Sequence, residues 1–377
     1  MTPLPHRLRE ALEGLDRPRP EARPWPGWAY TDPGLYALEQ QRLFEADWFG
    51  AASALDLDRP GAWVRVEGEG SWVVMVGADL TVRALRDVCT HRGAQLLEGD
   101  GGQLGRLCLV CPYHAWTFDS AGSLLRAPGM PEGFVRRDHG LHTGAATTRG
   151  GVIFVRKTGP GPGPPVPPWL APESLAPLRR ARRRTWEVAA NWKLLAQNFQ
   201  ESQHFATVHP ALESRTPAAQ STSLVGDGWL GGTMTLRDDL ETVSRSGKTL
   251  GRPFLVPPAH RRLVRDALLF PNVLTSLQPD YLLTYRLHPL GVDRTRVVGE
   301  ILLHAAAPED IAALDDLADF WDRTNDEDRQ AVEAQQRGLG SGPWVSPGYA
   351  LGEDGMAAFD RLLARRLLSS ITPAEAP

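Results

Sequence analysis

Two short cysteine–histidine pairs constrain the fold of this chain more than any other feature of its sequence. Cys89-Thr90-His91 reads C-x-H, and Cys111-Pro112-Tyr113-His114 follows as C-x-x-H. A zinc finger groups two cysteines and then two histidines, whereas each pair here mixes one thiolate with one imidazole. The pattern therefore indicates two facing loops, each of which offers one ligand of either kind.

That arrangement is the ligand set of a [2Fe-2S] cluster of the Rieske kind, in which two cysteines bind one iron and two histidines the other. Cys89 and Cys111 would hold the inner ferric iron, and His91 and His114 the outer iron. Neutral imidazole ligands raise the reduction potential to roughly −150 to +300 mV, against about −400 mV for plant-type ferredoxins. The third cysteine, Cys108, lies outside the pattern, and we expect it to be a small buried hydrophobe.

The residues around these ligands extend the pattern. CTHRG followed by CPYHAWTFDSAG resembles the ligand signature of the Rieske family, including the proline after the second cysteine and Trp116 after the second histidine. Ala115 stands where a glycine is common. A structural zinc site is the alternative reading of the same four ligands.

A second metal site is indicated by the stretch NWKLLAQNFQESQHFATVHP, residues 191–210. We expect one helix that Pro210 ends, with Glu201 and His204 on one face and His209 one turn further on. Two histidines and one carboxylate form the facial triad of non-haem Fe(II) oxygenases, which leaves positions open for O2. Spacing alone does not select the carboxylate, because a later stretch supplies further acids. The candidates are Glu201, Asp326, Glu327, Asp328 and Glu333.

Over nearly its whole length the chain resembles the catalytic (alpha) subunit of Rieske non-haem iron oxygenases. The resemblance rests on NWK, E-x-x-H-x-x-x-x-H-P, FPN, PDY, and ED followed by E-x-x-Q-R-G-L. It implies that His204, His209 and Asp328 bind a mononuclear Fe(II) and that O2 is a co-substrate. It also implies a head-to-tail homotrimer in which Glu201 bridges its own His204 and His114 of a neighbouring subunit.

The expected fold class is α+β. It comprises a small all-β Rieske domain and, as the resemblance implies, a helix-grip (START-like) catalytic domain with an antiparallel sheet and long helices. The expected boundaries are an N-terminal arm and helix at 1–46 and the Rieske domain at 47–158. The run GPGPGPPVPP gives a linker at 159–168, and the catalytic iron domain follows at 169–377.

Periodicity and end signals place the main elements. Short strand-like runs fill residues 63–152 and 223–304. Helices are expected near residues 6–14, after a cap at Thr31 or Asp32, from Pro308 to Gly338, and at 354–368. The run RRARRR, Arg179–Arg184, is expected to be a solvated turn, with a docking surface for an acidic redox partner as the alternative.

The charge and composition of the chain limit the kinds of partner that we expect it to bind. The formal net charge of −4 gives no basic excess for nucleic acid. No apolar run is long enough for a membrane span, and the N-terminal residues lack a signal-peptide core, so we expect a cytoplasmic protein. No dinucleotide-binding fingerprint or P-loop is found, so NAD(P)H and flavin would act only through a separate reductase, possibly with a ferredoxin.

The segment ALLFPNVLTSLQPDYLLTYRLHPLGVDRTRV and the late RGL most resemble the branch of this family that oxidises quaternary ammonium compounds such as glycine betaine, stachydrine, choline and carnitine. Oxidative N-demethylation or hydroxylation of such a compound is the expected reaction, with arene hydroxylation, a non-catalytic Rieske electron carrier and a structural zinc protein as alternatives. QNFQESQH replaces the ENxxECxH that is frequent in that branch. A cation would need an aromatic cage, for which the chain offers Trp229, Phe254, Tyr281, Tyr285 and Trp344.

Overall fold

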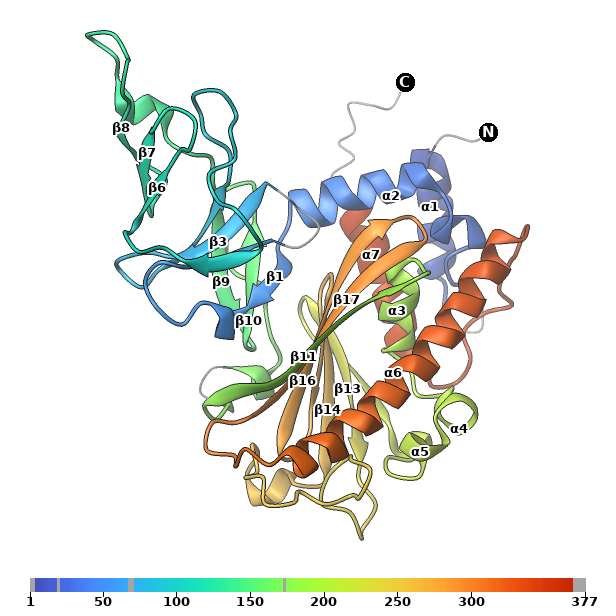
Figure 1. Cartoon of the computed structure of the whole chain (residues 1–377). Coiled ribbons are helices and arrows are strands. Elements are labelled where there is room, and N and C mark those ends of the chain that lie inside the picture. The colour runs from blue at the N-terminus through green and yellow to red at the C-terminus, as the bar shows by residue number, and fades with distance from the viewer. Residues whose placement is uncertain (1–3, 19–20, 67–70, 172–173, 369–377) are drawn as a thin grey trace. The chain divides into compact units, whose positions relative to one another are not determined.

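The chain forms two compact units in the computed structural model, which describes residues 4–18, 21–66, 71–171 and 174–368. One unit combines Met1–Leu43 with Pro165–Pro377, and the other is Phe44–Pro164. Figure 1 shows a small unit made mainly of strands and a larger unit in which helices accompany a sheet. Among the described residues, none of the helices has both the length and the apolar character that a membrane span requires.

The smaller unit is built from antiparallel strands. One sheet has the order β1-β10-β9-β4-β3-β2-β5, and a separate sheet has the order β6-β7-β8. Side chains of Val73, Met75, Trp116 and Phe118 are buried in its core together with Cys89. The bounds are β1 (Phe49–Ser53), β2 (Ala62–Arg65), β3 (Trp72–Val76), β4 (Val82–Arg86), β5 (Gly101–Gln103), β6 (Cys108–Val110), β7 (Thr117–Asp119), β8 (Leu124–Arg126), β9 (Thr143–Arg149) and β10 (Val152–Arg156).

The larger unit contains one antiparallel sheet in the order β11-β17-β16-β15-β14-β13-β12. Most residues of the central strands are buried, because the sheet is covered by helices. The predicted α+β class, with a small all-β domain and a second domain that has an antiparallel sheet and long helices, is confirmed. The bounds are β11 (Leu178–Val188), β12 (Thr222–Val225), β13 (Trp229–Thr235), β14 (Leu263–Leu269), β15 (Val273–Leu277), β16 (Tyr281–Gly291) and β17 (Arg294–His304).

The expectation that Arg179–Arg184 forms a turn is wrong. These arginines lie within β11, which pairs with β17 along its whole length. Arg180 and Arg183 form ion pairs with the buried Glu300 of β17, and Arg182 and Arg184 pair with an aspartate, Asp322, of a helix. Acids distant in sequence therefore neutralise the run, and the long aliphatic stems of arginine cover the sheet.

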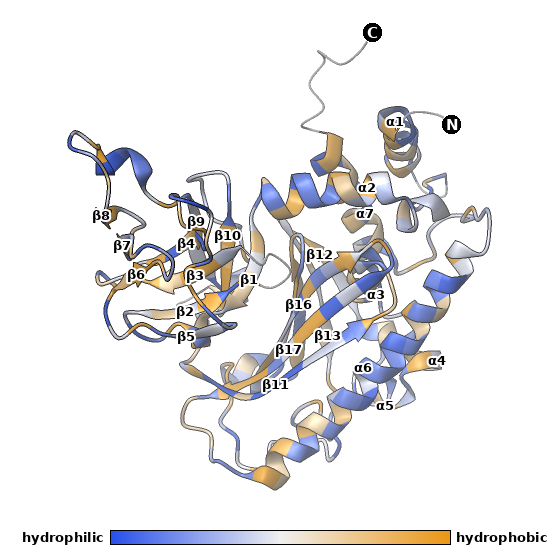
Figure 2. Cartoon of the chain, turned by 45° about the horizontal axis from the view of Figure 1, so that its top comes forward, coloured by the Kyte–Doolittle hydropathy of each residue, from blue (hydrophilic) through white to orange (hydrophobic). Residues whose placement is uncertain are grey.

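The helices agree with their expected positions except at their ends. They are α1 (Leu4–Leu15), α2 (Pro33–Glu39), α6 (Ile311–Gly340) and α7 (Asp354–Leu368), and a π-helical turn at Gln40–Glu45 continues α2. Asp32 caps α2 by accepting from the backbone of Gly34 and Leu35. Asp310 caps α6 in the same way, so Pro308 precedes the helix instead of lying in its first turn. Figure 2 shows hydrophilic and hydrophobic residues along the length of α6, as expected of an amphipathic helix.

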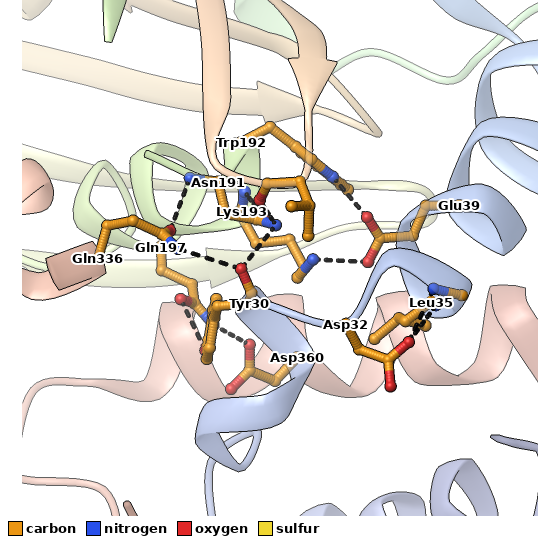
Figure 3. Close-up of polar contacts among 12 residues, drawn as sticks. Tyr30, Asp32, Leu35, Glu39, Asn191, Trp192, Lys193, Gln197, Gln336 and Asp360 are labelled. Atoms are coloured by element: carbon orange, nitrogen blue, oxygen red, sulfur yellow. Dashed lines mark hydrogen bonds and ion pairs between the residues drawn. The ribbon is translucent and has the colours of Figure 1, made fainter. Parts of the chain in front are cut away.

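A buried polar network fixes helix α3 (Trp192–Asn198) within the larger unit (Figure 3). Glu39, at the end of α2, accepts from Nζ of Lys193 at 2.6 Å and from Nε1 of Trp192 at 2.9 Å. Further along α3, Nε2 of Gln197 donates to Oδ1 of Asp360 in α7 at 2.5 Å. Because these groups are buried and paired, they hold α3 in one orientation and with it the residues that follow.

Candidate metal centres

Four predicted cluster residues lie on two adjacent loops of the smaller unit. Cys89 and Cys111 are buried, and the imidazole rings of His91 and His114 lie edge to face, with centroids 4.7 Å apart and an angle of 69° between their planes. Each loop is closed by a backbone hydrogen bond across the turn, from Cys89 N to Ala94 O at 2.8 Å and from Cys111 N to Trp116 O at 2.7 Å. The loops therefore bring both cysteines and both histidines together, as their order in the sequence predicts.

The Nδ1 atoms of His91 and His114 lack hydrogen-bond partners among the described residues, as expected if these nitrogens bind a cluster. Both nitrogens are buried. Buried nitrogens without a partner are costly unless a ligand occupies them. Two orphaned imidazole nitrogens beside two buried thiols fit the donor set of a Rieske cluster.

Two neighbours of these loops differ from expectation. Cys108 lies in β6 and is only partly buried, so the expectation of a buried hydrophobe is wrong, although it stays outside the group formed by Cys89 and Cys111. Ala115 has a φ of 55°. That left-handed conformation is one that glycine adopts without steric cost, and it costs other residues roughly 1–2 kcal/mol.

In the larger unit, His204, His209 and Asp328 form a compact group whose ligand atoms all lie within 4.8 Å of one another. Nε2 of His209 is 2.8 Å and Nε2 of His204 is 3.6 Å from Oδ1 of Asp328. Asp328 comes from α6, while both histidines come from the segment after α3. Two imidazoles and one carboxylate converging in this way fit the facial triad of Fe(II).

Two further carboxylates contact Nδ1 of the two histidine rings, the nitrogen that does not face Asp328. Oε1 of Glu201 lies 2.5 Å from Nδ1 of His204, and Oε2 of Glu327 lies 2.8 Å from Nδ1 of His209. A carboxylate at Nδ1 fixes the orientation of an imidazole and leaves Nε2 free to bind a metal. Sequence reasoning placed Glu327 among the possible ligands; the geometry instead places it behind His209, one residue before Asp328.

The charges of this group depend on one another. Burial lowers the pKa of His204, but hydrogen bonds with Asp328 and Glu201 outweigh burial and raise it to about 9. Burial acts to raise the pKa of Asp328, but hydrogen bonds with His204 and His209 lower it to about 2. The anionic carboxylate is therefore stabilised by positive charge at the point where a metal ion would lie.

The expectation of a single helix over residues 191–210 is wrong. Asn191 caps α3, but α3 ends at Asn198, and separate short helices follow as α4 (Phe205–Val208) and α5 (Pro210–Glu213). Glu201 accepts hydrogen bonds from the backbone N–H groups of Gln203 and His204. Such side-chain bonds compete with helical ones, so Glu201 and His204 meet across a turn and Pro210 begins a helix instead of ending one.

A cavity of about 110 Å³ adjoins this group, and His204, His209 and Asp328 form part of its wall. Of the five aromatic residues expected to form a cage, Tyr285 lines the cavity and the other four do not; Trp321, which was not among the five, also lines it. Tyr281 is fully buried, and its hydroxyl donates to the backbone oxygen of Val243. The remaining three lie away from the lining: Trp229 packs on Trp169, Phe254 lies under Arg261, and Trp344 is 42% exposed.

Comparison with known proteins decides the family. The model of the ring hydroxylating alpha subunit (catalytic domain) matches residues 175–369, and that of the Rieske [2Fe-2S] domain matches residues 47–144. The chain belongs to the ring-hydroxylating oxygenase alpha subunits. It is therefore a Rieske non-haem iron oxygenase, whose cofactors are a Rieske [2Fe-2S] cluster and a mononuclear iron.

Relatives of this oxygenase cover most of its length. The glycine betaine monooxygenase oxygenase subunit of Chromohalobacter salexigens is 28% identical, covering 88% of this chain and 83% of its own. The chloroplastic choline monooxygenase of Arabidopsis thaliana is 26% identical, covering 90% and 81%. A solved structure of the quaternary ammonium Rieske monooxygenase CntA matches with a TM-score of 0.75 at 22% identity, covering 95% of this chain and 98% of its own.

Proposed function

We propose that this oxygenase uses O2 and two electrons to hydroxylate an N-methyl group of a small quaternary ammonium compound. The resulting carbinol would release formaldehyde, a tertiary amine and a proton, and the second oxygen atom would leave as water. The observation that carries the proposal is the cavity itself. Its wall contains His204, His209 and Asp328 together with the aromatic residues Tyr285 and Trp321, which suit a cation without hydrogen-bond donors.

In this proposal Cys89, His91, Cys111 and His114 hold the Rieske cluster, and His204, His209 and Asp328 hold the mononuclear iron. The bound iron would supply activation of O2. The domain division we propose is an arm at 1–46, the Rieske domain at 47–158, a linker at 159–168 and the catalytic domain at 169–377.

The residues around the iron ligands have distinct roles in the proposed reaction. Glu201 and Glu327 hold Nδ1 of the two histidines, so that each ring presents Nε2 toward Asp328. Asn198 donates to Oδ1 of Asp328 at 2.6 Å and thereby restricts rotation of that carboxylate. Phe205 and Leu212 add apolar side chains to the wall of the cavity.

Glu201 would also act as the bridging carboxylate between subunits. We propose a cytoplasmic homotrimer in which Glu201 binds its own His204 and a neighbouring subunit's Rieske histidine, His114. Electrons would enter from a separate flavin and iron–sulfur reductase. Support comes from the position of Glu201, whose Oε1 lies 2.5 Å from Nδ1 of His204 and whose side chain is still 12% exposed, so that a remaining lone pair can accept from a neighbour's imidazole.

The proposed reaction is tested by measuring O2 uptake and formaldehyde release together. Full-length enzyme with a reductase would be supplied in turn with N-methylated cations, zwitterionic betaines and aromatic acids. Equimolar formaldehyde and O2 consumption with an N-methylated compound is the expected result. Uptake coupled only to an aromatic acid, with a hydroxylated ring as product, would replace the proposal with arene hydroxylation.

A further inference from the structure

Asp266 is a partly buried residue whose carboxylate belongs to the wall of the same cavity. It lies in the middle of β14, opposite Gly232 of β13 and Ser276 of β15. Its Oδ1 atom is buried and has no hydrogen-bond partner in the part of the chain that the structure describes. A buried carboxylate oxygen without a partner carries a large desolvation cost, so such an oxygen on a residue that lines a cavity indicates a ligand.

Ser276 is a hydrogen-bond partner of Asp266, and the described part of the wall around them offers a second acceptor but no lysine or arginine. Nε2 of Gln278 donates to Oγ of Ser276 at 2.8 Å, which leaves Oε1 of Gln278 buried and unpaired in the described structure. Gln278 and Ser276 both line the cavity, and none of the described lining residues is a lysine or an arginine. This part of the wall therefore offers one carboxylate and one amide oxygen to whatever occupies the cavity.

We propose that Asp266 binds the positively charged group of the substrate and thereby selects compounds with a net positive charge over zwitterions. This inference rests on the proposed function. A betaine would place its own carboxylate in a cavity that already holds Asp266 and lacks a lysine or arginine, which is unfavourable at low dielectric. A quaternary ammonium alcohol carries the cation without that second anion.

The position of Asp266 relative to the aromatic residues suits this role. Tyr285 and Trp321 line the same cavity, so a trimethylammonium group there would meet aromatic rings together with a carboxylate. Cation–π attraction alone does not distinguish a cation from a zwitterion that carries the same ammonium group, whereas a fixed anion does. Asp266 is thus a specificity-determining residue in this account.

Three ligands distinguish the effect of ligand charge on binding from the effect of ligand shape. Choline is a cation, glycine betaine is a zwitterion with the same ammonium group, and neohexanol is the uncharged carbon isostere of choline. Binding of each to the full-length, metal-loaded protein would be measured by calorimetry for the natural chain and for Asp266→Asn, which keeps the shape of the side chain. Asp227→Asn is the matched control, because Asp227 lies in the exposed turn between β12 and β13.

We expect the natural chain to bind choline about 10- to 100-fold more tightly than glycine betaine or neohexanol. Asp266→Asn should remove that preference by weakening choline and strengthening glycine betaine, with neohexanol unchanged, and Asp227→Asn should bind like the natural chain. The inference is overturned if glycine betaine binds as tightly as choline, or if Asp266→Asn weakens neohexanol as much as choline. Failure of the proposed function is distinct, because then no N-methylated compound would yield formaldehyde.

Discussion

Nδ2 of Asn198, the last residue of α3, donates to Oδ1 of Asp328 at 2.6 Å. The same oxygen lies 2.8 Å from Nε2 of His209. A short helix that is fixed by buried contacts thus sets the position of the carboxylate on which both histidines converge. The polar network that fixes α3 therefore also helps to position the proposed iron site.

Replacing Asn198 with Ala should loosen the carboxylate of Asp328 without removing a ligand. We expect the affinity for Fe(II) at the mononuclear site to fall about 10- to 100-fold, as is typical when a partner of a metal ligand is removed. Competition with a chelator of known affinity measures the change. Affinity equal to that of the natural chain would show that Asn198 does not position Asp328.

The two carboxylates behind the histidines should give separable phenotypes. Glu327→Gln should weaken iron binding about 10- to 100-fold, because Glu327 orients His209 alone. Glu201→Gln should weaken iron binding to a similar degree and, in protein with both metal centres loaded, should also slow oxidation of the reduced cluster in a single turnover about 10- to 100-fold. Stopped-flow absorbance of the cluster reports that rate, and an unchanged rate in Glu201→Gln would refute the bridging role.

Breaking the buried ion pair between Lys193 and Glu39 should destabilise the larger unit. Both side chains are almost completely buried, so Lys193→Met leaves an uncompensated anion and should cost about 3–5 kcal/mol. The double variant Lys193→Met with Glu39→Gln should recover part of that loss. Urea unfolding followed by tryptophan fluorescence tests this, and equal losses in both variants would contradict it.

Affinity for a cationic substrate should rise with pH. Burial raises the pKa of Asp266 to about 7. The other titratable side chains in the wall of the cavity are those of Tyr285, Asp328, His204, His209 and Glu201. Only the ionised carboxylate attracts a cation, so binding is lost as Asp266 gains a proton. Between about pH 8 and about pH 6 the affinity for choline should fall about tenfold, and Asp266→Asn should show no such dependence in calorimetry.

Much of this architecture follows from local sequence, and the exceptions have physical causes. The cluster loops were predictable because their ligands lie close together in sequence and need a fixed order. The strand at Arg179–Arg184 was not, because the acids that neutralise it come from β17 and α6. β-propensity depends on such neighbours more than on the segment itself.

The residues of the proposed iron site also divide into those that the sequence marks and those that only the fold reveals. His204 and His209 are marked by their spacing and by Pro210, whereas the break after Asn198 depends on Glu201 accepting backbone N–H groups that a helix would use. Asp328 could be selected from the acids of α6 only by resemblance to a family. Glu327 and Asp266 became visible only once the fold placed them beside His209 and within the cavity.

The most direct test of the account is the iron content of the full-length protein after Asp328→Ala, with Asp326→Ala on the same helix as the control. The natural chain and Asp326→Ala should each hold about three irons, two in the cluster and one in the mononuclear site. Asp328→Ala should hold about two, with no product formed and an unchanged Rieske EPR signal. A third iron retained in Asp328→Ala, or loss of the Rieske signal, would contradict the assignment of Asp328 to the mononuclear iron.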